Sequence, residues 1–202
     1  MYVRDAKNRD EAWLLEHIEA MDLDETAFRS RDYVIAVDEE SNTRAGFGRI
    51  RLHKIGDGGE TGAESGTELC ELTSIGVLDG WEGQGVGAHV IERLVDGADT
   101  EGFDRVYSLS SAHEYLAQFG FEAVPESELP RTLAERLEAK REQLDPDAVP
   151  MVIDPDDFVM PERLRERFKA AAEADADSEP EETAEDFGID PEEATYKYDT
   201  GS

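Results

Sequence analysis

The sequence has a single cysteine, few basic residues and no long apolar run. Cys70 is the only cysteine among 202 residues, so a disulfide within the chain is impossible and no cysteine-based zinc site is expected. No window approaches the roughly 18 consecutive apolar residues of a membrane-spanning helix. The charged start "MYVRDAKNRD" lacks the apolar segment of a signal peptide. These absences predict a soluble, cytoplasmic protein without a membrane partner.

Positive charge is scarce as well. Lysine and arginine together number 20, against 50 aspartates and glutamates, and the net charge is −30. Nothing resembles a basic patch, so nucleic acid is not expected as a partner. Acidic residues recur in every helical segment, which favours a halophilic source, because at about 1 M salt the Debye length falls to about 3 Å and self-repulsion is screened. The alternative is an ordinary acidic protein with an acidic tail.

The length fits one domain with an appendage. Residues 1–172 carry strand and helix patterns and predict an α/β (α+β) domain. From residue 173 the composition changes, and residues 173–186 contain no lysine or arginine. We therefore expect 173–202 to be an acidic, disordered tail. The alternative to disorder is that a short aromatic island in this tail docks on the core or on a partner. This island contains Phe187, Ile189, Tyr196 and Tyr198.

Apolar residues that alternate predict strands, and apolar residues at a spacing of three to four predict helices. The expected strands are 2–6, 33–38, 45–55, 67–78, 104–111, 121–125 and 148–154. The expected helices are 11–21, 88–102, 112–120, 128–144 and 161–174, with a short helix or turn at 24–28 and a glycine-rich hairpin loop at 56–66.

The segment "GWEGQGVGAH", Gly80 to His89, places Gly83, Gly85 and Gly87 just before an expected helix. A strand, a glycine turn and a helix N-terminus form a phosphate-binding arrangement, because the first N–H groups of a helix lack internal partners and glycines let an anion approach them. The Walker pattern is excluded because no lysine is present, and the dinucleotide pattern because the glycine spacing differs. A plain tight turn is the alternative.

With its flanking residues this segment resembles the acyl-CoA-binding segment of the GNAT N-acetyltransferases. "ELTSIGVLDGWEGQGVGAHVIERLV" fits their [Gln/Arg]-x-x-Gly-x-[Gly/Ala] pattern at Gly85 and Gly87, and "SSAHEYLAQFGF" ends in the Gly120-Phe121 pair expected downstream. The likeness extends to about residue 154 and looks closest to the amino-acid N-acetyltransferase branch. It implies the GNAT fold: a mixed, mostly antiparallel twisted sheet of six to seven strands flanked by helices, with a splayed central strand pair that forms the acyl-CoA cleft.

The resemblance also implies a function and a donor site. The chain would be an acetyl-CoA-dependent N-acetyltransferase that uses no metal, acts on a small-molecule amine such as an amino acid, and is a monomer or homodimer. An N–H group near Val77 would polarise the thioester carbonyl. The strand end, Val77 and Leu78, would pair with the pantetheine arm, and the loop N–H groups of Gln84, Gly85, Val86, Gly87 and Ala88 would bind the pyrophosphate. The alternatives are a protein lysine or N-terminal acetyltransferase and a non-catalytic acyl-CoA-binding module.

Glu71 is the candidate catalytic residue. It lies six residues before Val77, where several family members carry a general base. Alternation would put both side chains on one face of the strand. Apolar neighbours would raise the pKa of Glu71, which suits a base near neutral pH. The alternative is that Glu71 faces solvent on the other side of the pleat.

Two positions depart from the family pattern. Glu82 stands where glutamine or arginine is usual, and a carboxylate beside a pyrophosphate is unfavourable unless it points into solvent. Leu116 stands where many members carry a tyrosine that protonates the leaving thiolate. Its neighbour Tyr115 would point about 100° away on a helix. Either the thiolate leaves unassisted, or another group such as His113 or Ser111 protonates it.

The acceptor site has weaker candidates. Arg49 and Arg51 alternate on one strand and share a face. They could bind the carboxylate of an amino-acid acceptor, or they could pair with surface acids, which the chain has in surplus. Arg131 is a further candidate.

Overall fold

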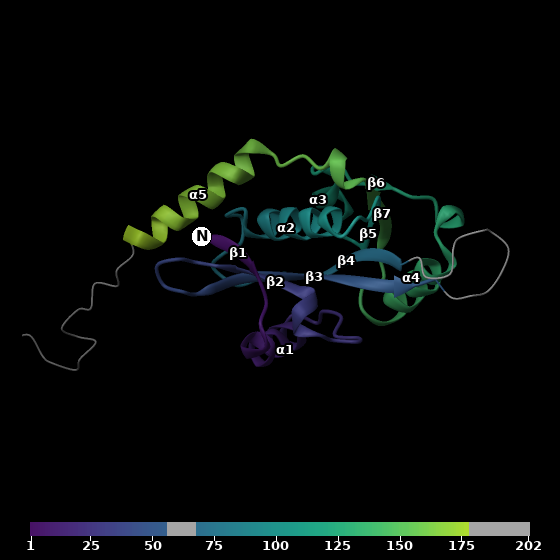
Figure 1. The fold of residues 1–202 in the computed structure, drawn as a ribbon, viewed down its shortest axis with the longest axis horizontal. Coiled ribbons are helices and arrows are strands. Elements are labelled where there is room, and N and C mark those ends of the chain that lie inside the picture. The colour runs from purple at the N-terminus through teal and green to yellow at the C-terminus, as the bar shows by residue number, and fades with distance from the viewer. Residues whose placement is uncertain (56–67, 178–202) are drawn as a thin grey trace, which may run out of the picture.

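The structure is a computed structural model that describes residues 1–55 and 68–177. In this part of the chain, seven strands form one sheet in the order β1-β2-β3-β4-β5-β7-β6 (Figure 1). β4 and β5 are parallel, and the other neighbouring pairs are antiparallel. The mixed, mostly antiparallel sheet of the prediction is thereby confirmed. The strands are β1 (Tyr2–Asp5), β2 (Tyr33–Val37), β3 (Arg44–Lys54), β4 (Glu68–Val77), β5 (Val106–Ser110), β6 (Glu122–Ala123) and β7 (Val149–Ile153).

Helices cover both faces of the sheet. They are α1 (Glu11–Ala20), α2 (Val86–Thr100), α3 (His113–Ala117), α4 (Arg131–Gln143) and α5 (Glu162–Asp177). In Figure 1, α2, α3 and α5 lie on one side of the sheet, and α1 and α4 lie on the other. Residues 24–28, expected as a short helix or turn, contain a turn at Thr26 and Ala27 and no helix.

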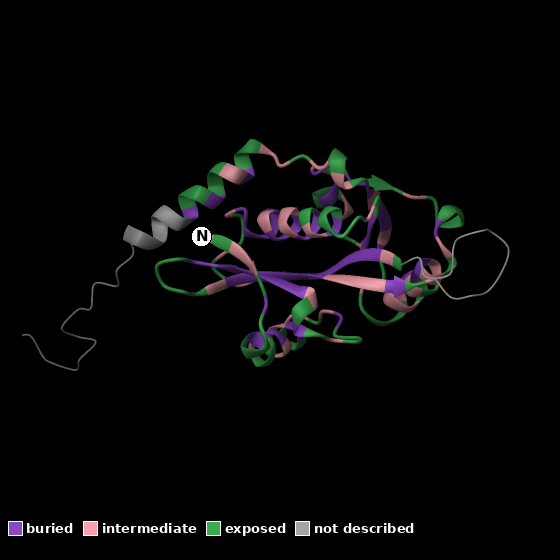
Figure 2. Cartoon of the chain, in the orientation of Figure 1, coloured by how far each residue is buried: buried purple, intermediate pink, exposed green. Residues whose placement is uncertain are grey.

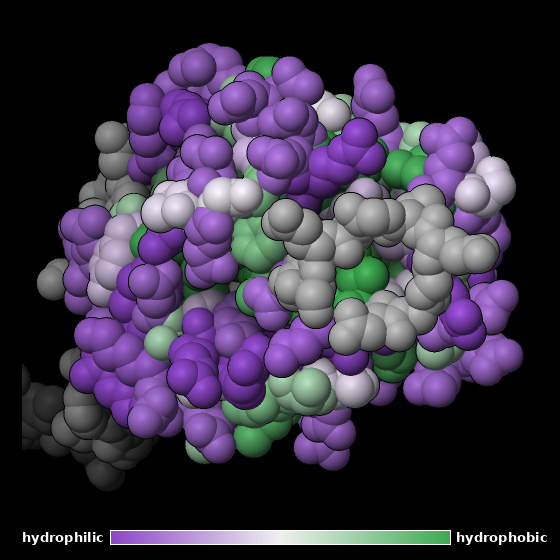
Figure 3. Space-filling model, turned by 45° about the vertical axis from the view of Figure 1, so that its right-hand side comes forward, coloured by the Kyte–Doolittle hydropathy of each residue, from purple (hydrophilic) through white to green (hydrophobic). Residues whose placement is uncertain are grey.

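The alternating side chains of the strands fill separate cores on the two faces. In β5, Val106 packs into the core beneath α2, whereas Tyr107 and Leu109 pack against Leu133 and Leu137 of α4. The sheet is therefore buried from both sides (Figure 2). The surface in Figure 3 is covered largely by hydrophilic side chains, as expected for so acidic a chain.

The parallel strands β4 and β5 pair over a short distance and then separate. Their register joins Cys70 to Val106, Glu71 to Tyr107 and Leu72 to Ser108. Beyond Leu72, β4 continues to Val77, and no described strand pairs with it on this side. The splayed central pair of the prediction is thus present, and it opens the sheet in the middle.

A β-bulge in β4 alters which side chains share a face. Phe47 pairs with Gly76 and Arg49 with Thr73, so one residue of β3 faces two residues of β4, and Ser74 has a φ of +50°. An extra residue on one strand reverses the alternation that follows it. The expectation that Glu71 and Val77 share a face is therefore wrong. Val77 packs toward α2, and the Glu71 carboxylate bonds groups on the opposite face.

Two of the predicted segments lie partly or wholly outside the described residues. The glycine-rich loop 56–66 falls in the undescribed part 56–67, and the aromatic island falls in 178–202. α5 continues to Asp177, so it enters the segment that was expected to be a disordered tail. The boundary between domain and tail at residue 173 stays a prediction.

Candidate functional site

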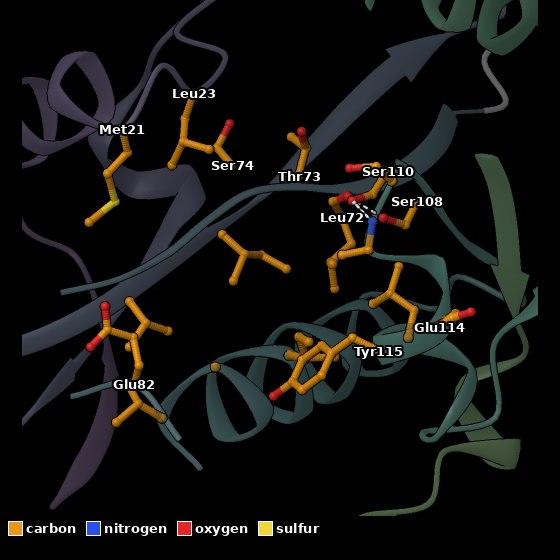
Figure 4. Close-up of a pocket in the computed structure, with 18 of the residues that line it drawn as sticks. Met21, Leu23, Leu72, Thr73, Ser74, Glu82, Ser108, Ser110, Glu114 and Tyr115 are labelled. Atoms are coloured by element: carbon orange, nitrogen blue, oxygen red, sulfur yellow. Dashed lines mark hydrogen bonds between the residues drawn. The ribbon is translucent and has the colours of Figure 1, made fainter. Parts of the chain in front are cut away.

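A cavity of about 1020 Å³ occupies the gap between β4 and β5 (Figure 4). On the α2 side its wall includes Val86, Gly87 and Tyr115, and on the opposite side it includes Asp24 and Lys140. The cavity therefore reaches both faces of the sheet. Two molecules bound from opposite faces could meet in the gap between the strands.

The glycine loop forms one end of this cavity. Gly83 and Gly85 have φ values of +71° and +82°, a region that side-chain-bearing residues avoid, and Gly85 caps the N-terminus of α2. The first helical hydrogen bond of α2 runs from the His89 N–H to the Gly85 carbonyl, at 3.1 Å. The N–H groups of Val86 and Gly87 precede it and have no acceptor within the helix. They are available to an anion in the cavity.

The predicted donor-binding residues divide into two groups. Val77, Gly85, Val86 and Gly87 line the cavity, and Leu78, Gln84 and Ala88 do not. The Leu78 N–H donates to the Ala45 carbonyl at 2.9 Å. Because successive N–H groups of a strand point to opposite edges, the N–H of Val77 points toward the open edge of β4. At this strand end, Val77 and not Leu78 therefore has the N–H group that can bind a ligand.

Two side chains of the loop are bonded within the loop itself. The carboxylate of Glu82 is exposed and accepts a hydrogen bond from the Gly80 N–H at 3.0 Å. The Gln84 amide donates to the Gly80 carbonyl at 2.7 Å. Glu82 therefore stabilises the turn, although its negative charge remains at the cavity wall.

Tyr115 lies in the cavity, whereas Leu116 is buried in the core beneath α2. Figure 4 draws the Tyr115 ring among the side chains that line the cavity. Its hydroxyl lies 3.5 Å from the point that a β-carbon on Gly87 would occupy, and the Val77 side chain lies 3.3 Å from the same point. Burial raises the pKa of the Tyr115 hydroxyl, so it stays protonated at neutral pH. Of the two other candidate acids, Ser111 lines the cavity and His113 does not.

Glu71 is completely buried in a cluster of charged groups. Its Oε2 contacts His53 Nε2 at 2.7 Å and Arg136 Nε at 3.4 Å, and its Oε1 has no partner among the described residues. Burial alone would raise the pKa of Glu71, but the His53 hydrogen bond and the charges of Arg136 and Lys140 outweigh it, and the pKa is lowered. The expected rise in pKa is therefore wrong, and so is the alternative that Glu71 faces solvent.

The cavity end opposite the glycine loop is polar. Asp24 lines it and accepts hydrogen bonds from Arg136 and, at 3.1 Å, from Arg51. Thr73 also lines it, and its buried hydroxyl has no partner among the described residues (Figure 4). Lys140 reaches this end from α4 and donates to the Leu109 carbonyl. Burial lowers the pKa of Lys140, and the charge of Glu71 opposes that shift.

The arginines expected at the acceptor site lie outside the cavity. Arg49 is buried and bonds the Thr26 carbonyl at 2.7 Å and the Tyr33 hydroxyl at 3.3 Å. Arg51 pairs with an acid, Asp24, but this carboxylate is buried, so the expected pairing with surface acids is wrong for Arg51. Arg131 is exposed and pairs with Glu135 at 2.8 Å.

Several cavity residues were not identified from the sequence. Asp24 follows a helix without a motif around it, and Lys140 occurs in a run of charged helical residues. Arg163 and Arg167 of α5 also line the cavity, near the glycine loop. Their spacing of four residues puts them on one face of the helix. This spacing is the only feature of the sequence that could have identified them.

Comparisons with known proteins identify the family. Residues 2–121 match the sequence profile of the Acetyltransferase (GNAT) family. The chain belongs to this family. The family is one of acetyltransferases, and the glycine loop with its cavity fits acetyl-CoA as a donor. No curated protein is similar enough in sequence to match the chain.

Solved structures with the same fold include several acetyltransferases. N-acetylglutamate synthase from Neisseria gonorrhoeae, complexed with coenzyme A and N-acetyl-glutamate, is 20% identical, with a TM-score of 0.56 over 75% of this chain and 34% of that one. Rv2747 from Mycobacterium tuberculosis, in complex with CoA and NLQ, is 16% identical, with a TM-score of 0.59 over 76% and 99%. A GNAT acetyltransferase from Staphylococcus aureus is 12% identical, with a TM-score of 0.51 over 76% and 98%. The chain thus spans about a third of the synthase.

The part of the chain that is described lacks two further features. No helix there is both long and apolar enough to cross a membrane. Residues 1–55 and 68–177 contain no group of three or more histidine, cysteine, aspartate or glutamate side chains arranged to hold a metal ion.

Proposed function

We propose that this protein transfers the acetyl group of acetyl-CoA to the primary amine of a small molecule, with an amino acid as the acceptor. The cavity that crosses the sheet between β4 and β5 carries this proposal. It lets the donor enter beside the glycine loop and the amine approach the thioester from the other face. Holding both reactants in one gap replaces an encounter in solution by a fixed geometry.

The donor would lie along the open edge of β4. The pyrophosphate would accept hydrogen bonds from the N–H groups that begin α2, at Gly85 to Gly87. The pantetheine arm would follow the strand end, and the Val77 N–H would donate to the thioester carbonyl. As the amine nitrogen attacks, a negative charge develops on that oxygen, and a donor already in place stabilises it.

Tyr115 is the residue that we assign to the leaving group. When the new C–N bond has formed, the C–S bond breaks and the CoA thiolate needs a proton. The Tyr115 hydroxyl lies close to both Val77 and Gly87, and its raised pKa keeps the proton on it until the thiolate appears. The shift of one residue from the usual position, Leu116, is accommodated because Leu116 packs into the core.

Glu71 remains the proposed general base, and it would act through water. Its Oε1 is the carboxylate oxygen without a partner among the described residues, and a buried polar atom of this kind commonly bonds an ordered water. The lowered pKa keeps the carboxylate ionised at neutral pH. Arg136 pairs with both Glu71 and Asp24, and Asp24 lines the polar end of the cavity. Glu71 therefore lies one residue behind the cavity lining at that end.

The polar end of the cavity suits an acceptor that carries a carboxylate, as an amino acid does. Lys140 lines the cavity and supplies positive charge for that carboxylate, whereas the charge of Asp24 is already paired with Arg51 and Arg136. The synthase from Neisseria gonorrhoeae was crystallised with N-acetyl-glutamate, which supports the same acceptor class. The acidic surface supports an enzyme that works in a salt-rich cytoplasm.

An acceptor screen tests the proposal. The purified chain in about 2–4 M KCl, where surface repulsion is screened, would be mixed with acetyl-CoA and a panel of amino acids and polyamines. CoA release and the mass of the product would be measured. Release that depends on one amino acid, with a product heavier by one acetyl group, is the expected result.

Other outcomes assign the protein to another function. Acetylation of peptides with no reaction of any free amino acid would identify a protein acetyltransferase. Saturable binding of acetyl-CoA without turnover of any amine would identify a non-catalytic module. Reactions without acceptor serve as the control for hydrolysis of the thioester.

A further inference from the structure

The donor site has a deficit of positive charge in its loop. Coenzyme A carries a pyrophosphate and a ribose phosphate, and the chain around its site has a net charge of −30. The loop contains an acidic residue, Glu82, and this carboxylate lines the cavity. Backbone N–H groups bring only partial charges. Cations from elsewhere in the fold would remedy this deficit.

α5 is packed directly against the loop. Leu164 and Phe168 are buried in the core that α2 shares, and the Phe168 ring stacks on His89 with centroids 3.7 Å apart. A β-carbon on Gly85 would overlap the Leu164 carbonyl oxygen. The glycine at this position therefore permits the close approach of α5. Beside these contacts Arg165 pairs with Glu92 of α2 at 2.8 Å.

Arg163 and Arg167 lie on the face of α5 that borders the cavity. Arg163 donates to the amide oxygen of Gln118, and Arg167 donates to the Gly83 carbonyl at 3.3 Å. Both acceptors are neutral, and no carboxylate pairs with either arginine in the part of the chain that is described. Arg165 and Lys169 of the same helix both pair with glutamates. Among the described residues, two guanidinium groups at the cavity wall thus have no anionic partner, in a chain where acids outnumber bases.

We propose that Arg163 and Arg167 bind the phosphate groups of the acyl donor and supply the positive charge that the loop lacks at Glu82. The inference rests on the proposed function, because it takes the loop end of the cavity as the phosphate end of acetyl-CoA. Guanidinium groups bind phosphate oxygens through paired N–H donors. α5 lies beyond residues 2–121, which match the family. The donor site of this chain is therefore completed by a helix outside the matched segment.

Calorimetric titration of single variants tests the assignment. The full chain and the variants Arg163→Ala, Arg167→Ala and Lys169→Ala would each be titrated with CoA and with S-acetylpantetheine, which has no phosphate. We expect each arginine variant to bind CoA about 10-fold more weakly, since hydrogen bonds to charged groups are the strong ones. S-acetylpantetheine should bind all four proteins equally. Lys169→Ala removes the same charge from the same helix and should bind CoA as the unchanged protein does.

The two ligands separate the possible results. If the unchanged chain binds no CoA, the proposed function fails. If it binds CoA and the arginine variants bind it equally well, the assignment to α5 is overturned and the proposed function stands. Equal losses for both ligands would also overturn the assignment, because α5 would then act only by supporting the fold. Recovery of CoA binding in Arg167→Lys and Arg163→Lys would support a role in charge.

Discussion

Replacement of Gly85 by alanine tests the packing of α5 against the glycine loop. Two effects add at this position. An alanine at a φ of +82° occupies the left-handed region, which costs about 1–2 kcal/mol. The new β-carbon also overlaps the Leu164 carbonyl oxygen, and such overpacking typically costs about 1–3 kcal/mol. We expect a loss of about 2–5 kcal/mol in the free energy of unfolding.

Gly83 offers a matched control. Its φ is +71°, and a β-carbon there would meet nothing within 4 Å. Gly83→Ala therefore carries the backbone cost alone, about 1–2 kcal/mol. The difference between the two variants isolates the contact between the loop and α5.

Urea unfolding in about 2–4 M KCl, where surface repulsion is screened, would give both free energies by linear extrapolation. Limited proteolysis would report whether α5 leaves the loop in the Gly85 variant. Equal losses for Gly83→Ala and Gly85→Ala would refute the reasoning, because the overlap with Leu164 would then have no energetic effect.

Three further predictions concern catalysis and pH. Tyr115→Phe should lower kcat by about 10- to 100-fold at unchanged acetyl-CoA affinity, whereas Tyr2→Phe, at a tyrosine that does not line the cavity, should not; unchanged kcat would exclude Tyr115 as the acid. Glu71→Gln should lower kcat by about 100-fold or more, and Glu68→Gln on the same strand should have no effect; if only stability falls, Glu71 is structural. The buried Asp10 accepts hydrogen bonds from two arginines, which hold its pKa far below 3.8. Its ionised form therefore stabilises the fold above pH 3.8, and this stabilisation is lost as the pH falls. The free energy of unfolding should fall with pH in this range for the unchanged chain and not for Asp10→Asn; the same fall in both would contradict the role of Asp10.

Much of the fold could be predicted because the strands and helices have clear apolar periods. The alternation in β3 and the spacing in α2 are of this kind, and the structure contains both elements. The bulge in β4 could not be predicted, because Ser74 adopts a positive φ that neither its residue type nor its neighbours indicate. That one residue moved Val77 to the face opposite Glu71.

Of the candidate site, the glycine loop was predicted, and its neighbours from distant parts of the chain were not. A run of glycines indicates a close approach of something to the backbone, but it does not indicate of what. The sequence assigned the approach at Gly85 to a phosphate, and the structure adds a second neighbour, the Leu164 carbonyl. The contact joins residues far apart in the chain, and the helical pattern of α5 does not specify its partner. Charge pairs between residues far apart in the chain, such as Arg136 with Glu71, could not be predicted for the same reason.

A crystal structure with acetyl-CoA bound would test the central claim most directly. We expect the pyrophosphate to lie against the N–H groups at the start of α2, with Arg163 and Arg167 beside the phosphates. We expect the thioester to lie in the gap between β4 and β5, with its carbonyl oxygen at the Val77 N–H. A donor bound with its phosphates away from the glycine loop, or with its thioester outside the gap, would contradict the account.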